Sequence, residues 1–168
     1  MLVPGNGGSD VLRNMSLVLR TVHDSTSLPA IRTSAQHPDL RVRLEAIKTL
    51  LAFDTSVPRK LLEEAINDRD PKMAETAIAL VGNYGIKEAV DPLLQILARR
   101  DFFGKRRPLR ILAIKALGEL AEPGALPQMD HLFSTSFLPW PNRNERKAAF
   151  ESLAAYPQAA RAPFVART

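Results

Sequence analysis

Residues 109–120 read LRILAIKALGEL, and the apolar side chains in this stretch recur with the period of an α-helix. Four of them stand at positions i, i+4, i+8 and i+11, which places them on one face of a helix with about 3.6 residues per turn. These four are Leu109, Ala113, Leu117 and Leu120. The neighbouring Ile114 widens this face. The stretch therefore predicts an amphipathic helix with an Ala-Ile pair at the centre of its buried side.

Three further segments fill the same five positions of this pattern. They are Val42, Ala46, Ile47, Leu50, Phe53; Met73, Ala77, Ile78, Val81, Tyr84; and Glu145, Ala149, Phe150, Leu153, Tyr156. The alanines at 46, 77, 113 and 149 are 31, 36 and 36 residues apart. A small residue lets a neighbouring helix approach closely, and the bulky residue beside it fills the groove. Four copies at this period predict a helical repeat protein.

The rest of the chain completes a series of about nine helices. We expect them at residues 10–22, 28–35, 42–53, 57–66, 73–84, 89–98, 109–120, 125–133 and 145–156, with the start of another after 157. Four complete helix pairs are thus bracketed by unpaired helices, and no strand pattern occurs. The prediction is an all-α fold, a right-handed α-solenoid of antiparallel helix pairs.

The domain organisation is expected to be simple. Residues 1–9, MLVPGNGGS, are rich in Gly and Pro, and this composition predicts a disordered tail. Residues 10–168 predict a single solenoid domain. Because both ends resemble half of a helix pair, we expect the chain to be a fragment of a longer protein.

The composition is that of an ordinary soluble protein, with 45% hydrophobic and 24% charged residues among 168. The absence of cysteine excludes disulfides and cysteine-bound metal. No apolar run approaches the roughly 20 residues that span a bilayer, and the start lacks the pattern of a signal peptide. We therefore expect a cytoplasmic protein with no membrane partner.

Residues 109–118 read as an aliphatic residue, Arg, two variable residues, Ala-Ile, one variable residue and Ala-Leu-Gly. This pattern resembles the second helix of HEAT repeats, in particular the short bacterial type of phycobilisome-lyase-like proteins. Arg43, Arg110 and Arg146 occupy the arginine position, whereas Ala74 departs from it. The resemblance implies a HEAT-like/ARM superhelix, and it implies a structural role for Arg110.

The resemblance covers about residues 25–157 and includes Asp70-Pro71 followed by MAETAIALVG. It implies a fold far more than a function, because such repeats serve as generic binding scaffolds. A bilin lyase component is a possible reading by family analogy alone, since no chromophore-handling residue can be identified.

No catalytic constellation is found in the sequence. The three histidines, His23, His37 and His131, are far apart in the repeat scheme, and His37 stands where a turn or cap role is expected. The His-Glu pairs of the HEAT-like di-iron hydroxylases do not occur, nor do the common nucleotide or zinc motifs. Acidic residues fall on helix surfaces or turns. We therefore predict no enzyme activity, no cofactor and no metal.

The net charge of +5 is concentrated in residues 99–110, RRDFFGKRRPLR, where six cations accompany one carboxylate. This connection and residues 134–144 are both longer than typical turns, and turns of this kind stack on one edge of a solenoid. The candidate partner-binding residues on that edge are Arg99, Arg100, Phe102, Phe103, Lys105, Arg106, Arg107, Phe137 and Trp140. Aromatic residues and arginine are favoured at binding hot spots. The alternative is that the rings pack under their own loops and leave the cations solvated.

Two functions of different classes follow from these observations. The leading hypothesis is a non-catalytic scaffold or adaptor that binds another protein or domain. The alternative is nucleic-acid binding through the basic loop, distantly like the HEAT-like DNA glycosylases. Against the alternative, the second helices carry charges of both signs, whereas a groove for duplex DNA needs a row of cations along the phosphates.

Overall fold

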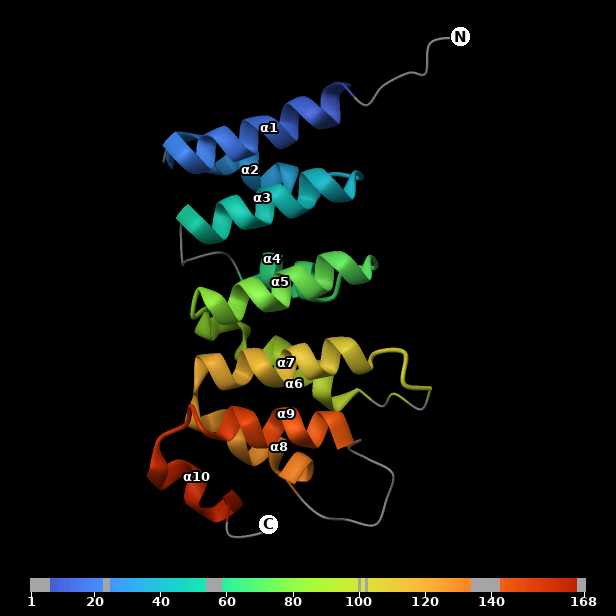
Figure 1. The fold of residues 1–168 in the computed structure, drawn as a ribbon. Coiled ribbons are helices and arrows are strands. Elements are labelled where there is room, and N and C mark those ends of the chain that lie inside the picture. The colour runs from blue at the N-terminus through green and yellow to red at the C-terminus, as the bar shows by residue number, and fades with distance from the viewer. Residues whose placement is uncertain are drawn as a thin grey trace. The chain divides into compact units, whose positions relative to one another are not determined.

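The computed structural model describes residues 7–22, 25–53, 59–99, 101, 103–133 and 143–165, and these residues form helices joined by turns (Figure 1). The α-helices are α1 (Gly7–Val22), α2 (Leu28–Ser34), α3 (Leu40–Phe53), α4 (Arg59–Ile66), α5 (Pro71–Asn83), α6 (Val90–Ala98), α7 (Arg107–Leu120), α8 (Leu126–Phe133), α9 (Arg143–Leu153) and α10 (Gln158–Val165). No strand occurs in these ranges. The all-α prediction is confirmed, and α10 is the helix expected to begin after residue 157.

Short 3₁₀ helices, prolines and residues in the left-handed conformation mark the ends of several helices. Pro29 and Pro71 lie in the first turns of α2 and α5, where a missing N–H leaves no hydrogen bond unmade. Gly85 follows α5 with a φ of 66°, and Ala121 takes the same left-handed conformation, with a φ of 49°, in the equivalent position after α7. Both residues end a helix in the way that favours a glycine. The two repeats therefore share their turn geometry as well as their helices.

The N-terminal helix begins earlier than its sequence indicates. Asp10 is a good N-cap residue by type, but α1 begins at Gly7, so Asp10 lies in the first turn of the helix.

Within the described residues, no helix is long and apolar enough to cross a membrane.

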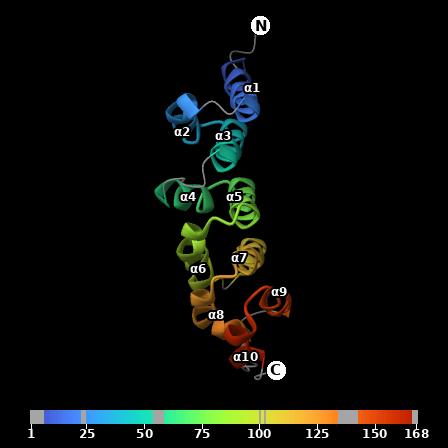
Figure 2. The ribbon, with the colours of Figure 1, turned by 90° about the vertical axis from the view of Figure 1, so that its left-hand side faces the viewer.

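The chain forms two compact units, residues 1–80 and 81–168. In the first unit, α1 and α2 pack on α3. In the second unit, the first helices of the pairs, α6 and α8, lie on one side and the second helices, α7 and α9, lie on the other (Figure 2). The helix α10 packs against α8, where the rings of Phe133 and Phe164 have their centroids 5.4 Å apart.

The repeated Ala-Ile pairs lie in the core, as predicted. The four alanines of the pairs, Ala46, Ala77, Ala113 and Ala149, are each at most 1% exposed. The three isoleucines that follow the first three alanines are equally buried, whereas Phe150, which follows the fourth, is only half-buried. The buried alanines therefore confirm the register at the centre of each copy, whereas Tyr84, at the last position of the second copy, is 44% exposed.

The glycine that ends the Ala-Leu-Gly motif has a packing role. A Cβ atom on Gly118 would lie 2.5 Å from the Cβ of Ser152 and 3.1 Å from its Cα, so the bare glycine allows α9 to lie close against α7. Near the end of α9, the hydroxyl of Tyr156 donates a hydrogen bond of 2.8 Å to the carbonyl of Leu117. These contacts fix the spacing and the register of the two second helices.

Candidate functional site

In the connection between α6 and α7, the buried carboxylate of Asp101 binds the backbone. The backbone N–H of Arg106 donates to Oδ2 of Asp101 at 2.8 Å, and the N–H of Gly104 donates to the carbonyl of Asp101 at 3.3 Å. Gly104 has a φ of 68°, in the left-handed region that glycine adopts at least cost. The single acidic side chain of this connection is thus occupied by the backbone.

The other charged side chains of the connection are exposed. Arg99, Lys105, Arg106 and Arg107 are exposed, and the ring of Phe103 is 88% exposed. Phe103 therefore does not pack under its own loop. We call these five residues the basic edge, and they place four cations beside one accessible aromatic ring.

Arg110, in the first turns of α7, holds the base of the basic edge. Its Nη1 donates to the carbonyls of Ile96, Leu97 and Arg99, at 3.3, 2.7 and 3.1 Å. These carbonyls lie at the end of α6, where the helix has no backbone donors of its own for them. The Nε and Nη2 atoms donate to the two carboxylate oxygens of Glu145 on α9, at 2.9 and 3.3 Å. One guanidinium thus joins α6, α7 and α9.

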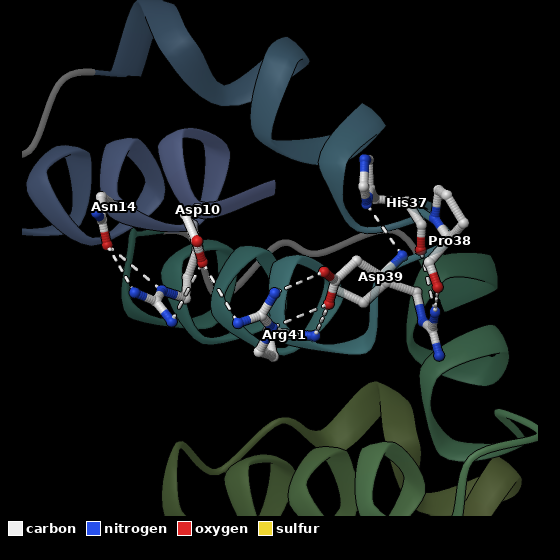
Figure 3. Close-up of polar contacts among 8 residues, drawn as sticks. Asp10, Asn14, His37, Pro38, Asp39 and Arg41 are labelled. Atoms are coloured by element: carbon white, nitrogen blue, oxygen red, sulfur yellow. Dashed lines mark hydrogen bonds and ion pairs between the residues drawn. The ribbon is translucent and has the colours of Figure 1, made fainter. Parts of the chain in front are cut away.

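The first unit contains an equivalent arginine, Arg43, that binds both backbone carbonyls and a carboxylate. Nη1 of Arg43 donates to the carbonyls of His37 and Pro38, at 3.0 and 2.9 Å, and its Nε and Nη2 each donate to Asp68 at 3.1 Å. His37 has the turn role expected of it, because its Nδ1 accepts the N–H of Asp39 at 3.1 Å (Figure 3). The structural role that the resemblance implied for Arg110 is therefore confirmed, and Arg43 has an equivalent role in the first unit.

Four of the predicted edge residues, Arg100, Phe102, Phe137 and Trp140, lie outside the described residues. The aromatic shelf that they would form with Phe103 stays a prediction. Of the residues that position the edge, Asp101 has no role that its sequence context predicts, and the sequence does not indicate that Glu145 pairs with Arg110. The available signal for Glu145 was a glutamate at a position that is aliphatic in the other three repeats.

The second helices carry charges of both signs, as the sequence indicated. On α9, Lys147 pairs with Glu151 at 3.8 Å, and on α3, Lys48 pairs with Glu45 at 3.6 Å. In the described part of the chain, no group of three His, Asp or Glu side chains is placed to hold a metal ion.

Buried Ala-Ile pairs and arginine anchors that recur from repeat to repeat define the chain as an α-helical repeat protein. A family model for HEAT repeats matches residues 58–154, more than half of the chain, and the chain therefore belongs to the HEAT-repeat family. HEAT repeats are in general protein-interaction scaffolds and are typically non-catalytic. Among curated proteins, the comparison gave no match.

Proposed function

We propose that the chain is a non-catalytic adaptor that binds another protein through the basic edge. The observation that carries the proposal is the exposure of four cations and Phe103 on one connection whose base is fixed by Arg110 and Asp101. A backbone that is already hydrogen-bonded, as that of Arg106 is to Asp101, loses less conformational entropy on binding. Arginine and aromatic side chains are common at interface hot spots.

The charge of the edge defines the partner that it fits. Because Asp101 is turned to the backbone, the exposed side chains of the edge are cationic or aromatic. They suit an acidic protein surface with an apolar contact for Phe103. Arg100, Phe102, Phe137 and Trp140 extend this surface if they lie beside it, as the sequence predicts.

The test begins with a photo-crosslinking residue at position 103 in the protein, followed by identification of the captured protein. Binding of that purified partner is then measured for a variant with Lys105, Arg106 and Arg107 replaced by alanine. The matched control replaces three exposed lysines outside the basic edge by alanine, namely Lys60, Lys72 and Lys115.

The proposal requires the edge variant to weaken binding at least about tenfold, or about 1.4 kcal/mol, with little change in the control. Equal losses in both variants would show that only net charge matters. Turnover of a substrate by the purified chain would contradict the non-catalytic role.

Nucleic-acid binding is the second candidate, favoured by the same cluster of exposed cations. Its test is a titration with duplex and single-stranded DNA at two salt concentrations. Binding that falls steeply with salt and is lost in the Lys105/Arg106/Arg107 variant would favour it, because released counterions make phosphate contacts salt-dependent. The paired charges on α3 and α9 argue against an extended DNA-binding face.

A further inference from the structure

In the second unit, α9 packs against α7 through contacts at a defined row of positions on α7. Arg110 binds Glu145, the carbonyl of Leu117 accepts from Tyr156, and Gly118 lies against Ser152. We call the positions of Arg110, Ile114, Leu117 and Gly118 the acceptor face of a second helix. On α7 all four of these residues are buried.

The corresponding face of α9 is covered only in part by the described residues, among which Leu153 is 3% exposed. The counterparts, 36 residues later, are Arg146, Phe150, Leu153 and Ala154. Nε of Arg146 is buried and has no hydrogen-bond acceptor in the structure, whereas the Nε atoms of Arg43 and Arg110 each bind a carboxylate. Phe150 is half-buried and Ala154 is exposed.

A groove of about 630 Å³ continues this face onto α10. Phe150 and Leu153 of α9 and the following Ala154 line it together with Arg161, Ala162 and Val165 of α10. Its walls are largely apolar, and Arg146 lies one helical turn before Phe150 on the same side of α9. The site therefore suits an apolar helix that brings one carboxylate.

The helix α1 presents the complementary face. On α9, Glu145 and Ser152 contact α7, and Ala149 lies between them on the same side. The apolar rhythm of α1 places Val11, Met15 and Val18 at these three positions. They are 63%, 45% and 57% exposed, and together they form an apolar row at i, i+4 and i+7.

The opposite side of α1 is already in use, which supports this register. Ser16 is buried, and its carbonyl accepts the hydroxyl of Thr49 on α3 at 3.0 Å. In the same register Ser16 is the counterpart of Phe150, so it belongs to the acceptor face of α1. The helix α1 thus packs against α3 on one side, and its apolar row is exposed on the other.

We propose that a second copy of this chain occupies the groove, with α1 of one copy packed on α9 of the next as α9 packs on α7. The helix α10 would then lie beside a second helix, and the exposed apolar row of α1 would be buried. Burial of such a row is favourable in proportion to its apolar area. The two faces differ, so the contact is head-to-tail and leaves each copy a free face that can bind a further copy.

The carboxylate for Arg146 is available on α1. Asp10 is the only acidic residue of this helix and adjoins Val11, the counterpart of Glu145. Within one chain it pairs with Arg41 at 3.4 Å and Arg13 at 3.8 Å, all in half-exposed positions (Figure 3). Exposed pairs of this kind contribute at most about 1 kcal/mol. Breaking them so that Asp10 can pair with Arg146 of another copy therefore costs little.

The first experiment measures molar mass by light scattering at rising protein concentration, with two variants at exposed positions. Val18→Asp blocks the apolar row of α1, and Val165→Asp blocks the groove. The unmodified chain is expected to exceed the mass of two copies, and each variant alone is expected to stay monomeric. A mixture of the two variants should form a one-to-one dimer, because one intact face of each kind remains.

The second experiment tests the ion pair. Arg146→Glu should raise the dissociation constant of the assembly at least about tenfold, and adding Asp10→Arg to it should restore most of the affinity. Lys147→Glu, an exposed change on another side of α9, is the charge-matched control and should have little effect.

Three outcomes overturn the proposal: an unmodified chain that is monomeric at all concentrations, a Val165→Asp variant that still dimerises, or an Arg146→Glu loss that Asp10→Arg does not repair. The variant with Lys105, Arg106 and Arg107 replaced by alanine should assemble normally. Self-assembly and partner binding at the basic edge can therefore fail independently.

Discussion

Arg110 and Glu145 form a two-point ion pair between α7 and α9, with Nε to Oε1 at 2.9 Å and Nη2 to Oε2 at 3.3 Å. The residues are 4% and 0% exposed. Such a pair costs desolvation, and the arginine recovers part of that cost by also binding the carbonyls at the end of α6. The pair therefore connects helix packing in the second unit to the basic edge.

Glu145→Leu should destabilise the second unit by about 3–5 kcal/mol, because it leaves a buried guanidinium without its carboxylate. Adding Arg110→Met should recover part of this loss, since both positions then carry apolar side chains. Urea denaturation of the single and double variants measures the difference. Lys147→Ala, which breaks an exposed pair, is the control and should change the unfolding free energy by less than about 0.5 kcal/mol. A double variant no more stable than Glu145→Leu would contradict this account.

Gly118→Ala should lower the melting temperature although alanine is the better helix former. The added Cβ would meet the Cβ of Ser152 at 2.5 Å, and overpacking of this kind costs about 1–3 kcal/mol. The gain in helix propensity offsets only about 1 kcal/mol. Gly124→Ala is the matched control, because a Cβ there meets nothing within 4 Å. Equal melting temperatures for the two variants would show that α7 and α9 separate at little cost.

Tyr156 should make stability depend on pH in the alkaline range. Burial, with a smaller contribution from Glu122, raises the pKa of Tyr156 from 10.0 to about 12. Because the folded state holds the phenol proton more tightly, its contribution is present below pH 10 and is lost as the pH rises from 10 to 12. The shift corresponds to roughly 2–3 kcal/mol.

The comparison is with Tyr156→Phe, measured by urea denaturation between pH 8 and 12. At pH 8 this variant should lose only about 0.5–1.5 kcal/mol, since the carbonyl of Leu117 keeps a second donor in the N–H of Ala121. Its stability should fall less steeply above pH 10 than that of the unmodified chain. Parallel curves would rule out Tyr156 as the titrating group.

The helices and the core could be predicted from the sequence because both follow from local periodicity. The Ala-Ile pairs marked the buried positions, and an arginine repeated at one position indicated a structural role. The partner of Arg110 could not be predicted in this way. A glutamate at position 145 has the appearance of a solvated charge, and its burial depends on a side chain 35 residues away. The left-handed conformation of Ala121 likewise follows from the packing of the turn and not from its residue type.

The candidate site was predicted in part for the same reason. Clustered cations and Phe103 are visible as composition, and the structure shows Phe103 and four of the cations to be exposed. Their role in binding stays a prediction. The inward turn of Asp101 depends on the backbone of Arg106 and has no signal in the sequence. The apolar rhythm of α1 was equally visible, but only the contact of Ser16 with α3 shows that Val11, Met15 and Val18 face outward.

Ala113→Leu should destabilise the second unit and leave the first nearly unchanged. Ala113 is 0% exposed and lies in the centre of α7, so three added heavy atoms overpack the core and cost about 1–3 kcal/mol. In a repeat protein each pair contacts only its neighbours, so the damage stays close to its origin.

Hydrogen exchange measured by mass spectrometry should therefore become faster around residues 89–156 and stay nearly constant in residues 28–53. Ala98→Leu, the same substitution at the exposed end of α6, is the matched control and should alter neither region. Uniformly faster exchange over both ranges would show that the two units unfold together. An unchanged melting temperature for Ala113→Leu would mean that the core around Ala113 has room for a larger side chain, contrary to the close packing that the repeated alanine indicates.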